Sequence, residues 1–151
     1  MKDIGLKLAW LAATAWIGSQ WAIGYLAVPV LFQTLPDKML AGMLAGKMFS
    51  LVSWLGIVAG CYLLAFRARP AGKAAMQYVP WWLLALLLAL TLGSEFGFQP
   101  AMASLKAQVY PADIMHTAYA GKFKMLHGIA SSLYLVQSLL GAALILKMSR
   151  R

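Results

Sequence analysis

Two side chains in this sequence could do chemistry inside a hydrophobic segment, Glu95 and His127. Glu95 is the one acid within the four long apolar stretches, and an ionised carboxylate in hydrocarbon is costly enough to indicate a functional role by default. His127, in the last stretch, is expected at a similar depth, and a Glu–His pair can relay protons or hold a cation. Two alternatives stay open: Glu95 could reach the interface and stay solvated, or the pair could be a structural hydrogen bond between helices.

Serines extend this predicted site. Ser50 and Ser53 in the second stretch and Ser131 in the fourth should lie at the depth of Glu95 and His127, so the sequence predicts a polar intramembrane cluster of these five residues. Nearer the middle of the stretches the notable polar residues are Ser19, Gln20, Gln137 and Ser138. The sequence therefore gives no continuous polar path from one side of the membrane to the other.

Methionine and histidine side chains form a second possible site, because thioether and imidazole groups are suitable ligands for Cu(I) or another soft metal. The candidate ligands are Met39, Met43, Met115, His116, Met125 and His127. The alternative is that methionine is a flexible apolar filler. No other cofactor is expected, and haem is not, because it normally needs two facing axial ligands and only His127 lies in a span.

Several function classes are excluded or disfavoured. No nucleotide-binding loop, zinc-protease motif or Ser-His-Asp arrangement occurs, so we expect no enzyme activity. The single Cys61 lies in an apolar run and indicates no disulfide framework. Thirteen Lys and Arg oppose four acids, a net charge of +9. These basic residues lie at segment ends, where they meet anionic lipid headgroups, so nucleic acid is not an expected partner.

The elements that must position these residues are membrane helices. The chain is 62% hydrophobic, against about 45–50% for a soluble domain, and a helix needs about 20 apolar residues to cross a bilayer. We predict an all-α membrane protein, a single domain over 1–151 that forms a four-transmembrane-helix bundle. The predicted spans are 8–32, 48–66, 80–98 and 125–146. Residues 33–47 carry apolar side chains at helical spacing, which predicts an interfacial helix between spans 1 and 2.

Small residues are expected to set how the helices pack. The pairs Gly56/Gly60 and Gly93/Gly97 lie within spans at the spacing that permits close backbone approach. They could pack within one bundle or form a contact with a second copy. Pro29, late in the first span, should free the carbonyl of Tyr25 and kink the helix.

The charge distribution predicts an orientation. Four spans place both termini and the middle connector on one side, which holds Lys2, Lys7, Arg67, Arg69, Lys73, Lys147, Arg150 and Arg151. The other side holds fewer basic residues, namely Lys38, Lys47, Lys106, Lys122 and Lys124. The positive-inside rule therefore places the N- and C-termini in the cytoplasm.

Short motifs also occur in order along nearly the whole chain: Trp16-Ile17-Gly18, Pro29-Val30-Leu31-Phe32, Leu35-Pro36, Ala41-Gly42, Ala45-Gly46, Phe49, Gln99-Pro100, Phe123, Leu126-His127-Gly128 and Leu133-Tyr134-Leu135-Val136. Their order and spacing resemble a bacterial four-helix integral membrane family, domain of unknown function 4149, which is similar to eukaryotic transmembrane protein 205. The resemblance implies a four-helix membrane fold. The eukaryotic relative is associated with resistance to platinum drugs, which loosely supports metal or toxic-solute handling. No catalytic residue follows, and no role for Glu95.

We therefore expect a small protein of the bacterial inner membrane. The leading hypothesis is a solute- or metal-related transport or resistance component with a polar, Met-rich site at its periplasmic end. The alternative is a non-transporting structural or accessory subunit. Such a subunit would pack against a partner membrane protein, or a second copy of itself, through its small-residue faces.

Overall fold

The structure, a computed structural model, describes residues 2–110 and 112–150, with side chains from residue 4 onward. These residues are mostly helical and contain no strand. In chain order the elements are α1 (Lys2–Trp21), the π-helix η1 (Ala22–Ala27), α2 (Val28–Thr34), α3 (Lys38–Ala68), α4 (Pro70–Ala75), α5 (Trp81–Gly93), the π-helix η2 (Ser94–Phe98), α6 (Gln99–Val109), the 3₁₀ turn η3 (Ile114–His116) and α7 (Ala120–Met148).

These elements join into four continuous rods that are long and apolar enough to cross a membrane. The rods are Ile4–Thr34, Lys38–Ala68, Trp81–Val109 and Ala120–Met148. The chain is thus a multi-pass, all-helical membrane protein, as the sequence predicts. Arg151 and the side chain of Lys2, both used above to predict orientation, lie outside the described residues.

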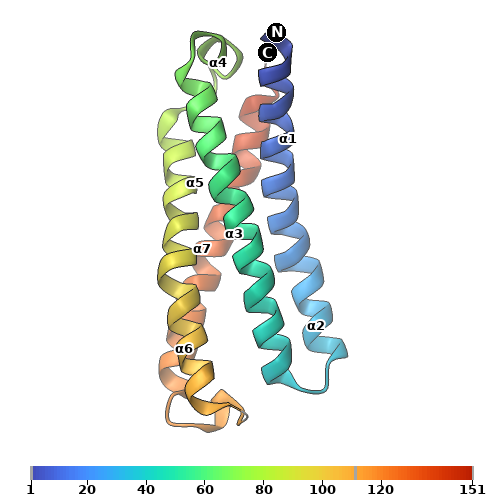
Figure 1. Ribbon diagram of the computed structural model, residues 1–151, viewed down its shortest axis with the longest axis vertical. Coiled ribbons are helices and arrows are strands. Elements are labelled where there is room, and N and C mark those ends of the chain that lie inside the picture. Colours follow the sequence, from blue (N-terminus) through green and yellow to red (C-terminus); the bar gives the residue numbers. More distant parts are fainter. Residues whose placement is uncertain (1, 111, 151) are drawn as a thin grey trace.

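The four rods form a square bundle (Figure 1). α1 packs against α3 and α7, and α5 packs against the same two helices. Both chain ends and α4 lie at one end of the bundle, which we call the terminal end. The loop before α3 and the loop that contains η3 lie at the other, which we call the distal end.

The rods are longer than the predicted spans. A rod of 29 residues, the shortest of the four, measures about 44 Å, whereas the hydrocarbon layer is about 30 Å thick. Apolar runs in the sequence locate only the part of each helix that needs lipid. The helices continue past those runs, because their hydrogen bonding does not stop where the side chains become polar.

The predicted interfacial helix needs a correction. Residues 38–47 are helical, but they are the first turns of α3 and not a separate helix between spans 1 and 2. Asp37 caps α3 by accepting hydrogen bonds from the backbone N–H groups of Met39 (2.8 Å) and Leu40 (3.1 Å). No proline or comparable cap follows before Arg69, so nothing interrupts the helix at the predicted boundary.

Pro29 acts on the first rod through its backbone. The six residues of η1, just before α2, are π-helical, and the N–H of Val28 bonds the carbonyl of Ile23 five residues back. A proline has no N–H to give the carbonyl four residues earlier, and π-segments are a common adjustment at such positions. The same arrangement recurs before Pro100, where η2 is π-helical and the N–H of Gln99 bonds the carbonyl of Ser94.

Glycine brings α3 against α1 in the half of the bundle near the termini. A Cβ added at Gly56 would overlap the indole of Trp16, and one added at Gly60 would lie 3.2 Å from Leu88. Trp16 is 1% exposed, and with Leu63, Leu84 and other apolar residues it fills this half of the bundle. The Gly56/Gly60 pair therefore packs within the bundle.

The second glycine pair does not pack within the bundle, so of the two predicted alternatives only a contact with another chain remains for it. Gly93 and Gly97 are exposed, and a Cβ added at either would meet nothing within 4 Å. Sequence spacing alone cannot tell an inward-facing pair from an outward-facing one, because both satisfy the same Gly-x-x-x-Gly pattern.

Candidate functional site: a two-chambered cavity

The distal half of the bundle contains a partly open cavity made of two adjoining chambers. The inner chamber, of about 420 Å³, lies toward the middle of the bundle, and the outer chamber, of about 710 Å³, lies toward the distal end. Five residues line both chambers and form their common boundary: Val28, Phe49, Gln99, Met102 and His127. All four rods contribute to the walls, so the cavity is a property of the whole bundle.

The two π-segments border this cavity. Gly24 and Tyr25 of η1 line the inner chamber, while η2 contributes Ser94 to the inner chamber and Glu95 to the outer. A π-segment inserts an extra residue into a helical turn and turns the side chains that follow toward a new direction. The two prolines that accompany these segments therefore help to shape the site, Pro29 from outside the cavity and Pro100 as part of the wall of the outer chamber.

Neutral polar groups lie deep in the inner chamber. The Nε2 of Gln137 donates a hydrogen bond of 2.7 Å to Oγ1 of Thr91, which in turn donates to the carbonyl of Leu87 at 2.8 Å. Gln20 lines the same chamber with a side chain that is 1% exposed. Neither its Nε2 nor its Oε1 has a hydrogen-bond partner. A buried primary amide with two unpaired atoms is costly, so the chamber holds an unsatisfied polar anchor.

Two tyrosines connect the first rod to α7 beside this chamber. The hydroxyl of Tyr134 donates to the backbone carbonyl of Gln20, and that of Tyr25 donates to Oγ of Ser138 at 3.0 Å. A Cβ at Gly24 would overlap the ring of Tyr134. Gly24 is thus the residue that lets this ring reach across to the first rod.

The outer chamber carries the charged groups. Ser50 on α3 donates a hydrogen bond of 2.5 Å to Oε1 of Glu95, while Oε2 of Glu95 has no partner. Lys106 on α6 donates to the carbonyl of Gly42 at 2.9 Å and lies 5.4 Å from the ring centre of Phe123. Glu95 and Lys106 of the third rod therefore line the same chamber, together with Lys47 of α3.

The structure brings the predicted polar cluster to this cavity. Ser50 and Glu95 line the outer chamber, Ser53 and Ser131 line the inner chamber, and His127 lines both. The partner of Glu95 is Ser50, however, and not His127. His127 stacks on Phe123 with ring centres 5.8 Å apart.

The candidate soft-metal ligands are spread over the distal end. Met39 is buried against Leu105 and Ile114 in a small apolar cluster. Met43 and His127 line the outer chamber. The remaining candidates, Met115, His116 and Met125, are exposed and line neither chamber. The structure thus gathers two of the six around the cavity.

Sequence reasoning did not assign Gln20, Thr91, Tyr134 and Lys106 to the site. The signal that could have identified such residues is a polar side chain within an apolar run, as at Gln20 and Gln137. That signal does not reveal which helix face is inward, because the bundle is apolar on both its core and its lipid side.

Fold and cavity together define a helical membrane protein with a partly polar chamber between its spans. A comparison with family models identifies the group: residues 11–111 match the family described as Domain of unknown function (DUF4149), and the chain belongs to this family. The matched region begins at residue 11 in the first rod, covers the second and third rods, and ends before α7. No curated protein matches the chain, and no solved structure does.

Proposed function

We propose that the protein is a solute-binding component of a transport or resistance process, and that it takes up a small amphipathic solute in the distal cavity. The observation that supports this most directly is the pair of adjoining chambers with an unpaired amide at one end and charged side chains at the other. Cavities of about 300–1,000 Å³ that are mostly apolar, with a few polar groups, are the usual form of small-molecule sites.

The types of side chain that line the cavity favour an organic solute over a soft metal as the ligand. The polar groups of the inner chamber are mainly amides and hydroxyls, which are hydrogen-bonding groups and poor ligands for Cu(I). Within the described residues, no group of three or more His, Cys, Asp and Glu is placed to hold a metal ion. The soft-ligand side chains that line the outer chamber are Met43, Met102 and His127, which would give such an ion at most three protein ligands.

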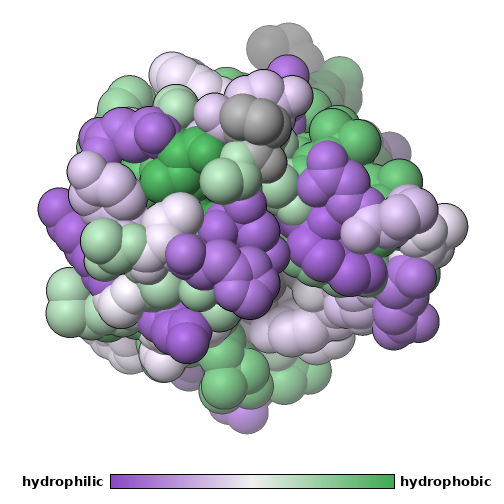
Figure 2. All heavy atoms as spheres, turned by 90° about the horizontal axis from the view of Figure 1, so that it is seen from below, coloured by the Kyte–Doolittle hydropathy of each residue, from purple (hydrophilic) through white to green (hydrophobic). Residues whose placement is uncertain are grey.

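The protein is proposed to lie in the bacterial inner membrane with its termini in the cytoplasm and the cavity on the periplasmic side. At the terminal end, the guanidinium of Arg67 lies 5.6 Å from the ring centre of Trp81, an arrangement suited to a membrane interface. At the distal end, hydrophilic side chains gather around apolar ones (Figure 2), and four exposed lysines contribute: Lys38, Lys47, Lys122 and Lys124.

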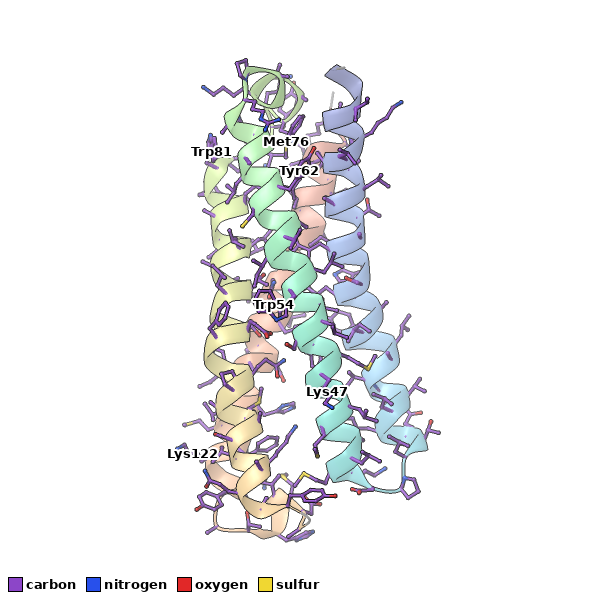
Figure 3. All side chains as sticks on the ribbon, in the orientation of Figure 1. Lys47, Trp54, Tyr62, Met76, Trp81 and Lys122 are labelled. Carbon is purple, nitrogen blue, oxygen red and sulfur yellow. The ribbon has the colours of Figure 1, made fainter. Side chains whose placement is uncertain are left out.

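The terminal half of the bundle is closed by packed side chains, among them the fully buried Leu63, Leu83 and Leu144. Figure 3 places Tyr62 and Met76 in this half and Lys47 and Lys122 toward the distal end. The cavity thus does not continue through the described bundle. A binding role that receives or hands over solute on one side fits this geometry, and transport would require the terminal half to open.

Filling the cavity tests the proposal. Ala130 on α7 lines the inner chamber, so Ala130→Phe should occupy it. Ala89 on α5 is exposed and lines neither chamber, which makes Ala89→Phe the matched control. Native mass spectrometry of the protein, extracted in mild detergent from cell membranes, should find a co-purifying small molecule on wild type and on Ala89→Phe, and not on Ala130→Phe. The same solute retained by both variants would remove the proposal.

A role as an accessory subunit is the second candidate, supported by the exposed pair Gly93 and Gly97. Small residues on a lipid-facing surface permit close approach of another helix. In this case Gly93→Leu should abolish a crosslink, formed in membranes, to a partner protein or a second copy. Unchanged crosslinking would exclude this face as the contact.

A further inference from the structure

We propose that the inner chamber selects an uncharged group that carries a hydrogen-bond donor and an acceptor side by side, such as a carboxamide, and that Gln20 holds this group. The inference deepens the proposed function and rests on it. It assigns a binding residue and a ligand class to the inner chamber.

The first argument is the unpaired amide. Gln20 lies in the middle of an apolar rod, is 1% exposed, and leaves both Nε2 and Oε1 without partners. Each unsatisfied polar atom in a water-poor interior costs free energy that a bound group would recover. Because one atom donates and the other accepts, a group with the same two functions can satisfy both atoms together.

The second argument is the absence of charge. None of the residues that line the inner chamber is Asp, Glu, Lys or Arg. An ion moved into this space would lose its hydration without gaining a counter-charge, which strongly disfavours ionic groups. Carboxylate and ammonium groups line only the outer chamber, where Glu95, Lys47 and Lys106 lie, and the imidazole of His127 lies at the boundary between the two chambers. The division between the chambers therefore places the neutral end of a solute inward.

The third argument is the shape of the wall. Four aromatic side chains border the inner chamber: Trp16, Tyr25, Phe49 and Tyr134. The hydroxyls of Tyr25 and Tyr134 are already used in bonds to Ser138 and to the carbonyl of Gln20. These rings thus offer mainly apolar surface. Among the described residues that line the inner chamber, Gln20 is the one whose buried side-chain polar atoms have no partner, while Ser53, Ser131 and Gln99 add further hydrogen-bonding groups to the wall.

Three probes with one carbon skeleton test the ligand class: 3-phenylpropanamide, 3-phenylpropanoate and 3-phenylpropylamine. Binding to the full-length protein in mild detergent is measured by saturation-transfer NMR titration at pH 7. We expect the amide to bind at least about ten-fold more tightly than either charged probe, since an uncompensated buried charge costs more than two hydrogen bonds contribute. Equal binding of the three probes, or no binding of the amide, would overturn the inference.

Two variants test the residue. Gln20→Met keeps the side-chain length and removes both polar atoms, and Gln20→Leu is a second apolar replacement in case the first does not fold. We expect about ten-fold weaker amide binding in either, with a higher melting temperature of the ligand-free protein because the unpaired atoms are gone. The control is Gln33→Met, at an exposed position outside both chambers. A lower melting temperature with unchanged amide binding would show a purely structural glutamine.

The two proposals fail in different ways. If wild type carries a co-purifying solute that Ala130→Phe loses, but Gln20→Met binds the amide normally, the solute-binding function stands and the assignment of Gln20 falls. If Ala130→Phe has no effect on any solute, the function itself falls, whatever the amide does.

Discussion

The two Gly-x-x-x-Gly pairs allow the packing of the bundle to be tested with one kind of substitution. At Gly56 an added Cβ would overlap the indole of Trp16, which is 1% exposed and packed among the core residues of the bundle. At Gly93 the added Cβ would meet nothing within 4 Å. Alanine also removes the intrinsic helix penalty of glycine, about 1 kcal/mol, at both positions, so this contribution largely cancels when the two variants are compared.

The remaining difference is the cost of overpacking, typically about 1–3 kcal/mol in a filled core. We therefore expect Gly56→Ala to have a free energy of unfolding lower than that of Gly93→Ala by this amount. The measurement is reversible unfolding in mixed micelles with increasing dodecyl sulfate, followed by far-UV circular dichroism. Gly18→Ala provides a second control, because Gly18 lies inside α1 and is equally open.

Two results would refute this reasoning. If Gly56→Ala were as stable as Gly93→Ala, α3 and α1 would not be in close contact at Gly56 and Trp16. If Gly93→Ala were the less stable variant, the exposed face of η2 and the end of α5 would be covered in the unperturbed protein, as expected for a subunit contact.

The other predictions concern the site and the topology. Ser50→Ala should lower the free energy of unfolding by about 1–3 kcal/mol, because it leaves both oxygens of Glu95 unpaired. In a double-mutant cycle, adding Glu95→Leu should remove most of this cost. Purely additive effects of the two substitutions would count against the hydrogen bond. Tyr134→Phe should cost about 0.6–2 kcal/mol in the same unfolding assay through its lost bond to the first rod. In a cysteine-free background in intact bacteria, Gln33→Cys should react with an impermeant maleimide and Lys73→Cys should not; the reverse pattern would invert the proposed orientation.

The sequence alone determined the class of the protein. Its excess of apolar residues needs lipid, and four runs of sufficient length leave a four-span helical protein as the expected outcome. The polar positions 50, 53, 95, 127 and 131 could be placed at one depth by counting residues along helices, and the structure brings them to one cavity. Depth is predictable because the rise of a helix per residue is constant.

The boundaries of the helices were harder to predict from the sequence, and α3 shows why. The sequence predicts a separate helix over 33–47. In the structure, α3 begins at Lys38 and runs without a break into the second span. Apolar runs report where a helix meets lipid, but caps and prolines decide where it begins and ends. Asp37 supplies the first signal and Arg69-Pro70 the last, and no comparable signal lies between them.

Only the tertiary structure decided which face of each helix points into the bundle. Gly56 and Gly93 have the same sequence pattern, yet one contacts Trp16 and the other is open. Likewise, Glu95 bonds Ser50 and not His127, and Gln20 proves to be the unpaired polar side chain of the inner chamber. In a water-soluble helix, hydrophobicity separates the core face from the solvent face. In a membrane helix both faces are apolar, so rotation about the axis is settled by packing between helices, which a single sequence does not display.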